Sequence, residues 1–372
     1  MAFKVVRYKG EHEPRVAEFN GRMAAAGSRW KFFESATPEW TPPGITEAVW
    51  RDYYLALDDA GPVRGAYCLK PQQFLLRGAP VSLAGLQGPV SEGVIDQRYV
   101  ALAFLLVRDM EEREPNIFSW GAADRLVELL KELGWVEILT PAQMRIVRPN
   151  RFLRKAEAFR KSARNRLILD GLAATGAGHV GAHLVQSAQG MAAGGLGVSK
   201  AQVLEHERFG AWADDIWAQA KGDYGLIARR DCEAMNALLP PTGWPEAHIL
   251  EVRDKGQAIG WAAVRDTQFV GDPRFGDLHV GSVIDSLAVP GAEKAVVRAA
   301  TAFLEQQGVD VLYTTYTHPA WISAFKASGY LVSAGRRPLL MTAGLAEALG
   351  DPAAAIRDAH LTPIDCDGPH GL

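Results

Sequence analysis

Strand-like and helix-like hydrophobic patterns alternate through the first 135 residues. Short apolar runs bounded by Gly, Pro and Asp indicate β-strands, whereas apolar residues spaced three and four apart indicate helices. The clearest change of period comes where Val100, Ala103, Leu106 and Val107 recur at helical spacing. The pattern predicts strands at 4–8, 53–57, 63–69, 72–76, 81–90 and 117–120, and helices at 13–26, 98–112 and 124–133.

A similar order of patterns returns after residue 247, beyond a stretch of different character. That stretch is basic from Arg145 to Arg166, rich in Gly and Ala over 171–197, and predicted to be helical over 199–220. After 343 we expect one short helix and a poorly ordered tail. The later half is predicted to contain strands at 248–252, 258–264, 283–289 and 311–316, and helices at 293–307 and 321–328.

The spacing of two pairs of glycines indicates that the pattern repeats. Gly134 follows Gly65 by 69 residues, Gly329 follows Gly260 by the same 69, and both pairs enclose the same order of elements. Equal spacing favours two copies of one unit offset by 195 residues, although glycines also recur at such points in unrelated α/β units. We therefore expect a first lobe over 1–150, a connector over 151–222, a second lobe over 223–342 and a C-terminal helix and tail over 343–372.

Composition and charge exclude several classes of protein. With 48% hydrophobic and 22% charged residues, the chain is a globular mixture and not a disordered or collagenous one. Its longest apolar run, Val100–Val107, is too short for a membrane span, and no secretory signal is recognisable. A net charge of −3 predicts no general attraction to nucleic acid or anionic membranes. Three scattered cysteines, Cys68, Cys232 and Cys366, favour a reducing compartment, so we expect a cytoplasmic location.

Each half reads as hairpin, strand, helix, strand and helix, and ends on Gly-aromatic. The closing helices, LVELLKELGW and WISAFKASGY, share their last turn. This order resembles the GNAT (GCN-related N-acetyltransferase) fold, and the whole chain resembles its tandem, Fem-like members. More narrowly, SEGVIDQRY and THPAWISAFKASGY resemble segments of GNAT-like proteins of bacterial polysaccharide clusters. The resemblance implies an α/β (α+β) protein of two tandem GNAT-like lobes, each a mixed, mostly antiparallel sheet flanked by helices.

The acyl-CoA loop of that fold needs small residues, because several backbone N–H groups must reach a pyrophosphate at a helix N-terminus. The family pattern, Gln/Arg-x-x-Gly-x-Gly/Ala, is matched in the first half by Arg98-x-x-Ala101-x-Ala103, which has no glycine. In the second half the offset of 195 gives Glu293, Val296 and Arg298, so the first half is the better candidate. A plain helix start with alanine on its packed face fits the first half equally. The residues expected to bind the cofactor are Gln97, Arg98, Tyr99, Val100, Ala101 and Ala103.

Two carboxylates precede this loop. Glu92 follows an apolar strand directly, where a general base would stand to take a proton from an attacking amine or hydroxyl. Asp96 lies four residues further on and fits equally well as the N-cap of the next helix. On the neighbouring short strand, Phe118 and Trp120 form either an apolar wall for an acyl chain or sugar ring, or part of the core.

The second half offers an Asp–His pair. Asp285 interrupts an apolar strand and needs a partner, which His318 at the end of the next strand could provide, as an acid/base unit or as a buried structural pair. The tyrosine that often serves as general acid in the family is replaced by Leu130 and Phe325. CoA must then leave as a thiolate stabilised by the helix N-terminus, or another residue must supply the proton.

The resemblance implies transfer of an acyl group from acetyl-CoA or a longer acyl-CoA to an amine or hydroxyl. An acyl carrier protein is an alternative donor, and a sugar or sugar nucleotide is the preferred acceptor. Acyl-CoA would act as a co-substrate, and no tightly bound cofactor is expected. No metal is expected either, because His179 and His183 have no third ligand nearby in the sequence.

Two other functions remain open. The run from Arg145 to Arg166 carries nine basic residues against one acid, Glu157, and is either a solvated connector or a rim for an anionic ligand. A Fem-like aminoacyl transferase would use this run to bind tRNA and would need no CoA loop. A non-catalytic ligand-binding protein on a decayed GNAT fold would explain the missing tyrosines and glycines.

Overall fold

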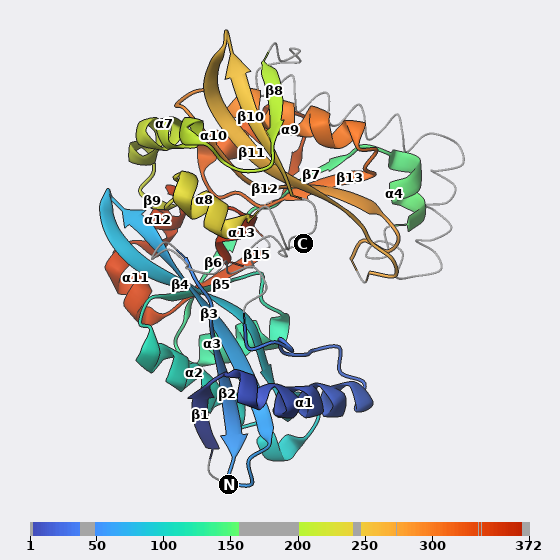
Figure 1. Cartoon of the computed structure of the whole chain (residues 1–372), viewed down its shortest axis with the longest axis vertical. Helices are drawn as coiled ribbons and strands as arrows, with labels where there is room; N and C mark the ends of the chain where they lie inside the picture. Colours follow the sequence, from blue (N-terminus) through green and yellow to red (C-terminus); the bar gives the residue numbers. More distant parts are fainter. Residues whose placement is uncertain are drawn as a thin grey trace.

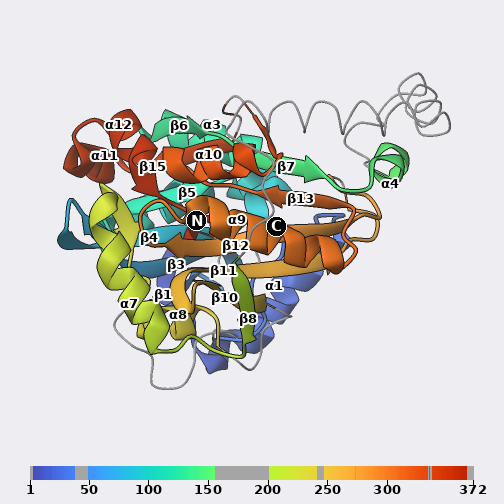
Figure 2. The same ribbon diagram turned by 90° about the horizontal axis from the view of Figure 1, so that it is seen from above.

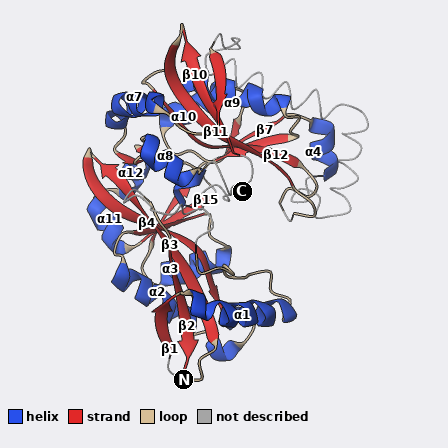
Figure 3. Ribbon diagram, in the orientation of Figure 1, coloured by secondary structure: helices blue, strands red, loops and turns tan. Residues whose placement is uncertain are grey.

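Two β-sheets flanked by helices lie one beyond the other along the long axis of the molecule (Figure 1). In Figure 3 the strands of both sheets are seen with helices packed against their faces. The protein is therefore a mixed α/β chain with two mostly antiparallel sheets, as predicted. The computed structural model describes residues 3–37, 49–155, 201–240, 247–272, 274–333, 335 and 337–366.

The first sheet, sheet A, has nine strands among the described residues. Seven form a continuous path, and β9 (Leu226–Ala228) joins β3 at its side and pairs with β16 (Ala359–His360). Within the path only β4 and β5 are parallel. The path runs β1 (Phe3–Arg7), β2 (Asp52–Asp58), β3 (Val63–Leu76), β4 (Ala79–Ser91), β5 (Ile117–Trp120), β15 (Arg337–Met341) and β6 (Val136–Thr140).

The second sheet, sheet B, has the same order of strands, and its parallel pair, β12 and β13, stands at the same place in the order. The seven strands described are β8 (Gln202–His206), β10 (Ala247–Asp254), β11 (Gln257–Gln268), β12 (His279–Ala288), β13 (Val311–Thr314), β7 (Gln143–Ile146) and β14 (Leu331–Val332).

In the continuous path of each sheet, one strand comes from the other half of the chain. β7 comes from the first 150 residues but lies in sheet B between β13 and β14. β15 comes from the later half and lies in sheet A between β5 and β6. The exchange ties the two halves together through backbone hydrogen bonds. The division of the chain at 150, 222 and 342 remains a prediction, and it does not follow the sheets at β7, β8, β9 and β15.

The glycines that measured the repeat have equivalent roles. A Cβ on Gly65 would lie 3.0 Å from the Cδ1 of Leu106, on α2 (Leu102–Arg113). A Cβ on Gly260 would overlap the Cγ2 of Val296, on α9 (Glu293–Gln306), and would lie 2.7 Å from the Leu287 carbonyl oxygen. In both halves the bare backbone lets a helix approach the sheet closely. Gly134 and Gly329 have φ of 90° and 81°, as expected of glycines that end helices. These shared roles support two copies of one unit, which stays a prediction.

Helices α1 and α2 cover opposite faces of sheet A. Tyr53 and Leu55 pack with α1, whereas Tyr54 and Ala56, which alternate with them on β2, pack with α2 and α3. In Figure 2, seen from above, α3 lies near the top of the view beside β6 and α1 lies in its lower half. The helices are α1 (Glu13–Ala25), α2 (Leu102–Arg113), α3 (Asp124–Glu132), α4 (Pro149–Lys155), α7 (Ala211–Ala220), α8 (Cys232–Leu238), α9 (Glu293–Gln306), α10 (Pro319–Ala327), α11 (Ala343–Leu349), α12 (Pro352–Arg357) and α13 (Pro363–Cys366).

Three local predictions were wrong. β3 is one continuous strand where the pattern predicted two, and the helix expected over 199–220 is a strand, β8, followed by α7. The tail expected to be poorly ordered is buried as far as Cys366, with α13 at the junction of the two sheets (Figure 1). A short segment of mixed polar and apolar residues shows no clear hydrophobic period. Its structure therefore cannot be predicted locally when the residues that it packs against lie far away in the chain. Among the described residues, the helices are all too short or too polar to cross a membrane.

Candidate active site

Strands β4 and β5 separate soon after they meet. They pair at Ala84–Ile117 and Gly85–Phe118, and no pairing continues beyond these positions. On its other side β4 bulges, because the register with β3 shifts near Gly88, whose φ is 51°. The bulge and the separation leave one backbone edge of β4 facing open space rather than a neighbouring strand.

A pocket of about 750 Å³ fills this separation. Its walls come from the end of β4, one face of α2, the end of β5 with the start of α3, and the residues 26–31 that follow α1. Because α1 and α2 lie on opposite faces of sheet A, the pocket reaches from one face of the sheet to the other. Such a passage lets two molecules meet from opposite sides of a sheet.

In the loop between β4 and α2, the backbone of residues 99–100 packs closely against Gly93. A Cβ on this glycine would lie 2.7 Å from the Tyr99 carbonyl oxygen and 2.9 Å from the Val100 Cα. The loop therefore needs glycine at 93, outside the pattern on which the sequence prediction relied. Ser91 caps the first turn of the loop, where its Oγ accepts a hydrogen bond from the Gly93 N–H at 3.1 Å.

Asp96 has the capping role that was the alternative to catalysis. Its carboxylate accepts a hydrogen bond from the Arg98 N–H at 3.0 Å and pairs with the Arg98 guanidinium at 2.6 Å. These bonds lower the pKa of Asp96 below its ordinary value, so the carboxylate stays ionised. The contacts favour a cap over a base, and a catalytic role for Asp96 stays an untested prediction.

One of the six predicted cofactor-binding residues lines the pocket. Ala103, on the first turn of α2, is a wall residue. Gln97, Arg98 and Tyr99 form a 3-10 turn, in which the Arg98 side chain is 72% exposed and Tyr99 is buried. Val100 and Ala101 are exposed beside the start of α2. The donor site predicted for this loop therefore stays a proposal, with Ala103 as its contact to the pocket.

Glu92 is buried in an ion-pair cluster instead of facing the pocket. Its carboxylate accepts hydrogen bonds from Arg22 of α1 at 2.6 Å and from Arg64 of β3 at 2.8 Å. It thereby ties α1 to the sheet next to the pocket. Its side chain is not among the pocket walls. These contacts favour a positioning role, and a catalytic role remains untested.

The corresponding separation in sheet B is filled by the chain itself. β12 and β13 pair at Val280–Val311 and Gly281–Leu312 and then diverge. The His360 Nε2 lies 2.8 Å from the Ser286 carbonyl oxygen, and the backbone of Thr317 is bonded to that of Leu361. The C-terminal strand β16 therefore occupies the position that is open in sheet A. This occupation favours sheet A as the ligand-binding half.

Aromatic rings complete this filling. Tyr316 packs against Trp321 at 5.6 Å and against Phe325 at 4.9 Å, and the rings of His360 and Tyr224 stack at 4.7 Å. Full burial lowers the pKa of His360 well below its ordinary value, so its imidazole is neutral. Phe325 and Leu130, at the positions of the family's tyrosine, are both buried core residues.

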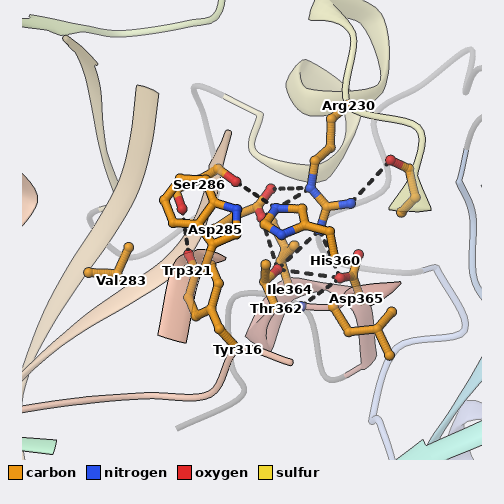
Figure 4. A network of polar contacts seen from close by, with 12 residues as sticks. Arg230, Val283, Asp285, Ser286, Tyr316, Trp321, His360, Thr362, Ile364 and Asp365 are labelled. Atoms are coloured by element: carbon orange, nitrogen blue, oxygen red, sulfur yellow. Dashed lines mark hydrogen bonds and ion pairs between the residues drawn. The ribbon is translucent and has the colours of Figure 1, made fainter. Parts of the chain in front are cut away.

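Asp285 belongs to a buried network beside β16 and α13, shown in Figure 4. Both of its carboxylate oxygens lie 3.1 Å from the Arg230 Nε, and Thr362 donates a hydrogen bond to it at 2.9 Å. The Arg230 Nη2 bonds Asp365 at 2.8 Å. Burial raises the pKa of Asp285 to about 6, against the lowering effect of Arg230. The network joins β12 to the C-terminal segment.

His318 does not pair with Asp285, so that part of the prediction was wrong. Its Nδ1 accepts a hydrogen bond from the Ala320 N–H at 3.4 Å and caps α10, and its Nε2 lies 4.0 Å from Asp358. Burial lowers the pKa of His318. The sequence pattern could not reveal Arg230, which competes for Asp285 from a loop far away in the chain. Catalytic roles for Asp285 and His318 remain untested.

Four of the five described basic residues of the run, all but Arg154, lie within 4.0 Å of an acid of the second half. Arg145 lies 2.8 Å from Glu305, Arg151 lies 3.4 Å from the buried Asp310, and Lys155 lies 3.1 Å from Asp277. The rest of the run, and His179 and His183, lie outside the described residues. In the part of the chain that is described, no cluster of His, Cys, Asp and Glu suits a metal ion.

Some residues of the pocket were not singled out from the sequence. Asp124 is the one carboxylate among the described wall residues, and the walls also carry the hydroxyls of Ser91 and Ser119. Asp124 had been recognised only as a helix start. Phe118 and Trp120 both belong to a buried core cluster, and Trp120 also lines the pocket.

Comparisons with known proteins identify the fold. No family model matches the chain, and no curated protein matches it significantly. Among solved structures, a GCN5-related N-acetyltransferase from Anabaena variabilis is similar over 94% of this chain and 74% of its own, with 11% identity and a TM-score of 0.54. Saccharomyces cerevisiae N-myristoyltransferase with bound myristoyl-CoA is similar over 91% and 78%, with 10% identity and a TM-score of 0.53. The chain therefore has the fold of the GCN5-related N-acetyltransferases.

Proposed function

We propose that this protein transfers an acyl group from acyl-CoA to an amine or hydroxyl, and that the pocket of sheet A is its active site. The observation that carries the proposal is the open separation of β4 and β5, which reaches both faces of the sheet. The similar structures, an N-acetyltransferase and an N-myristoyltransferase with bound myristoyl-CoA, support acyl-CoA as the donor.

The donor would enter from the face that carries α2 and α3. There the unpaired edge of β4 offers backbone N–H and C=O groups to an extended pantetheine arm, much as it would to an added strand. The start of α2, with the small side chain of Ala103 at the wall, offers its N-terminal N–H groups to the phosphates. The acceptor would enter from the face that carries α1.

The chemistry needs little besides orientation. The acceptor nitrogen or oxygen attacks the thioester carbonyl carbon, so that a C–N or C–O bond forms and the C–S bond breaks. The acceptor loses one proton and the departing CoA thiolate gains one, and no other reagent is consumed. Two residues are candidates for the general base. Asp124 is one because it lies at the pocket wall, and Glu92 is the other because it follows strand β4 directly in the sequence.

Calorimetric titration of acetyl-CoA and a longer acyl-CoA tests the proposal. Ala103→Trp should fill the pocket and weaken binding at least about tenfold, a loss of about 1.4 kcal/mol. The matched control is Phe104→Trp, on the exposed side of the same helix and outside the pocket, which should bind normally. Absence of binding in the wild-type protein, or equal loss in both variants, would contradict the proposal.

Several finer assignments remain proposals. The sugar or sugar-nucleotide acceptor, the role in polysaccharide synthesis, the acyl carrier protein and the cytoplasmic location rest on sequence resemblance and composition. The aminoacyl-tRNA alternative loses support, because four of the five described basic residues of the run have acidic partners. A salt-sensitive complex with tRNA, in a protein that does not bind acyl-CoA, would revive it.

A further inference from the structure

The pocket opens toward the α1 face through a short, well-anchored segment. Helix α1 ends in a Schellman motif, in which the Gly27 N–H bonds the Ala24 carbonyl at 2.9 Å and the Ser28 N–H bonds the Met23 carbonyl at 3.0 Å. The Ser28 Oγ then accepts a hydrogen bond from the Trp30 N–H at 3.2 Å. These bonds fix the segment 26–31, all of which lines the pocket.

This segment brings two cations and an indole to the pocket. Trp30 is 48% exposed although it lies at a pocket wall, and the Arg29 guanidinium carbon is 4.9 Å from the centre of its ring. At this distance the attraction between cation and indole ring holds the guanidinium near the ring and leaves its N–H donors available to a ligand. Lys31, also at the wall, adds a second positive charge.

The positive charge of the segment is weakly compensated. Lys31 lies 3.6 Å from Glu34, but both side chains are about 70% exposed, and such surface pairs contribute little. Among the described residues, Arg29 has no acidic partner within 4.0 Å. Asp124, the one acid among the described wall residues, comes from α3 on the other face of the sheet.

We infer that the acceptor is a small amine or alcohol that carries an anionic group, a carboxylate or a phosphate, bound by Arg29 and Lys31. This inference rests on the proposed function. It assigns these cations to the acceptor because the donor phosphates would lie at the start of α2, beyond the sheet. Arg29 can hold a carboxylate or phosphate through two parallel hydrogen bonds, and Trp30 gives the rest of the acceptor an apolar surface.

Matched acceptor pairs test this inference through the rate of CoA thiol release. The pairs are glucosamine with glucosamine 6-phosphate and tyramine with tyrosine, which differ only in the anionic group and separate phosphate from carboxylate. We expect the anionic member of at least one pair to have a kcat/KM about tenfold higher, the effect of one charge-assisted hydrogen bond. Arg29→Gln should remove this preference and leave the KM for acyl-CoA unchanged. Arg15→Gln, on the exposed part of α1 and outside the pocket, should change neither.

Equilibrium binding decides the case in which no member of the panel reacts. Glucosamine 6-phosphate and tyrosine are then titrated into the protein with acyl-CoA present, and binding weakened about fivefold or more by Arg29→Gln supports the inference. Equal turnover of neutral and anionic acceptors, or no binding of either anion, overturns it. Failure of the proposed function looks different, because acyl-CoA itself would then not bind.

Discussion

Removing the buried cation Arg230 should destabilise the protein strongly. Its guanidinium is completely buried and holds two carboxylates, Asp285 through Nε at 3.1 Å and Asp365 through Nη2 at 2.8 Å. In Arg230→Met both carboxylates would stay buried without a counter-charge. Breaking one buried pair in this way costs about 3–5 kcal/mol, and here a single substitution breaks two. We therefore expect at least that loss from a total stability of about 5–15 kcal/mol.

The adjacent arginine provides the control. Arg229 pairs at the surface with Asp231 and Glu233, and its side chain is partly exposed. Arg229→Met should therefore cost less than about 1 kcal/mol. Urea unfolding followed by circular dichroism measures both variants at pH 7. A second variant, Arg230→Met combined with Asp285→Asn, should recover part of the loss because one uncompensated charge is gone.

The pH dependence has a definite sign. The pKa of Asp285 is about 6 in the folded protein, above the value of about 3.9 in an unfolded chain. Between about pH 3.9 and about pH 6 Asp285 therefore binds more protons in the folded protein than in the unfolded chain. The free energy of unfolding that this group contributes is present at low pH and is lost as the pH rises through about 6. Without the lowering effect of Arg230 the Asp285 carboxylate protonates more readily, so the loss of stability in Arg230→Met should be smaller at pH 5 than at pH 7. A loss below 1 kcal/mol, or one equal at both pH values, would refute the reasoning.

Three further predictions concern separate parts of the chain. Gly260→Ala should lower the free energy of unfolding in urea by about 1–3 kcal/mol, because the new Cβ would press on a carbonyl oxygen of β12. Gly21→Ala, in the middle of α1 with open space around it, should leave stability unchanged or raise it, and equal effects of the two substitutions would contradict the packing argument. Glu92→Gln should lower the melting temperature, because Arg22 and Arg64 lose their carboxylate partner, and it should change kcat by less than about tenfold. A fall in kcat of about 100-fold at unchanged stability would identify Glu92 as the catalytic base. Burial raises the pKa of Cys68 to about 12, so at pH 8 a thiol reagent should label the partly exposed Cys232 first, and early labelling of Cys68 would show that sheet A opens.

The sequence predicted what depends on local patterns. The helices α1, α3 and α9 and most strands follow from hydrophobic period, and Gly65 and Gly260 located the equivalent close approaches of helix to sheet. The order of these elements was enough to indicate the fold. These features depend on residues that lie close together in the chain.

The features that the sequence did not predict depend on contacts between residues that lie far apart in the chain. Nothing local marks β7 and β15 as exchanged strands, or β16 as the segment that fills the separation in sheet B. The same limit applied to the site. Asp285 was recognised as needing a partner, but Arg230 and Thr362 reach it from elements outside its own hairpin.

Amide hydrogen exchange, with and without bound acyl-CoA, tests the central claim most directly because it locates the ligand. The account predicts slower exchange in the separation of sheet A, over residues 86–91 and 119–123, and at the start of α2. Residues 282–288 and 313–317 of sheet B, already closed by β16, should exchange as before. Protection confined to sheet B, or no protection in sheet A at saturating acyl-CoA, would contradict the assignment of the active site.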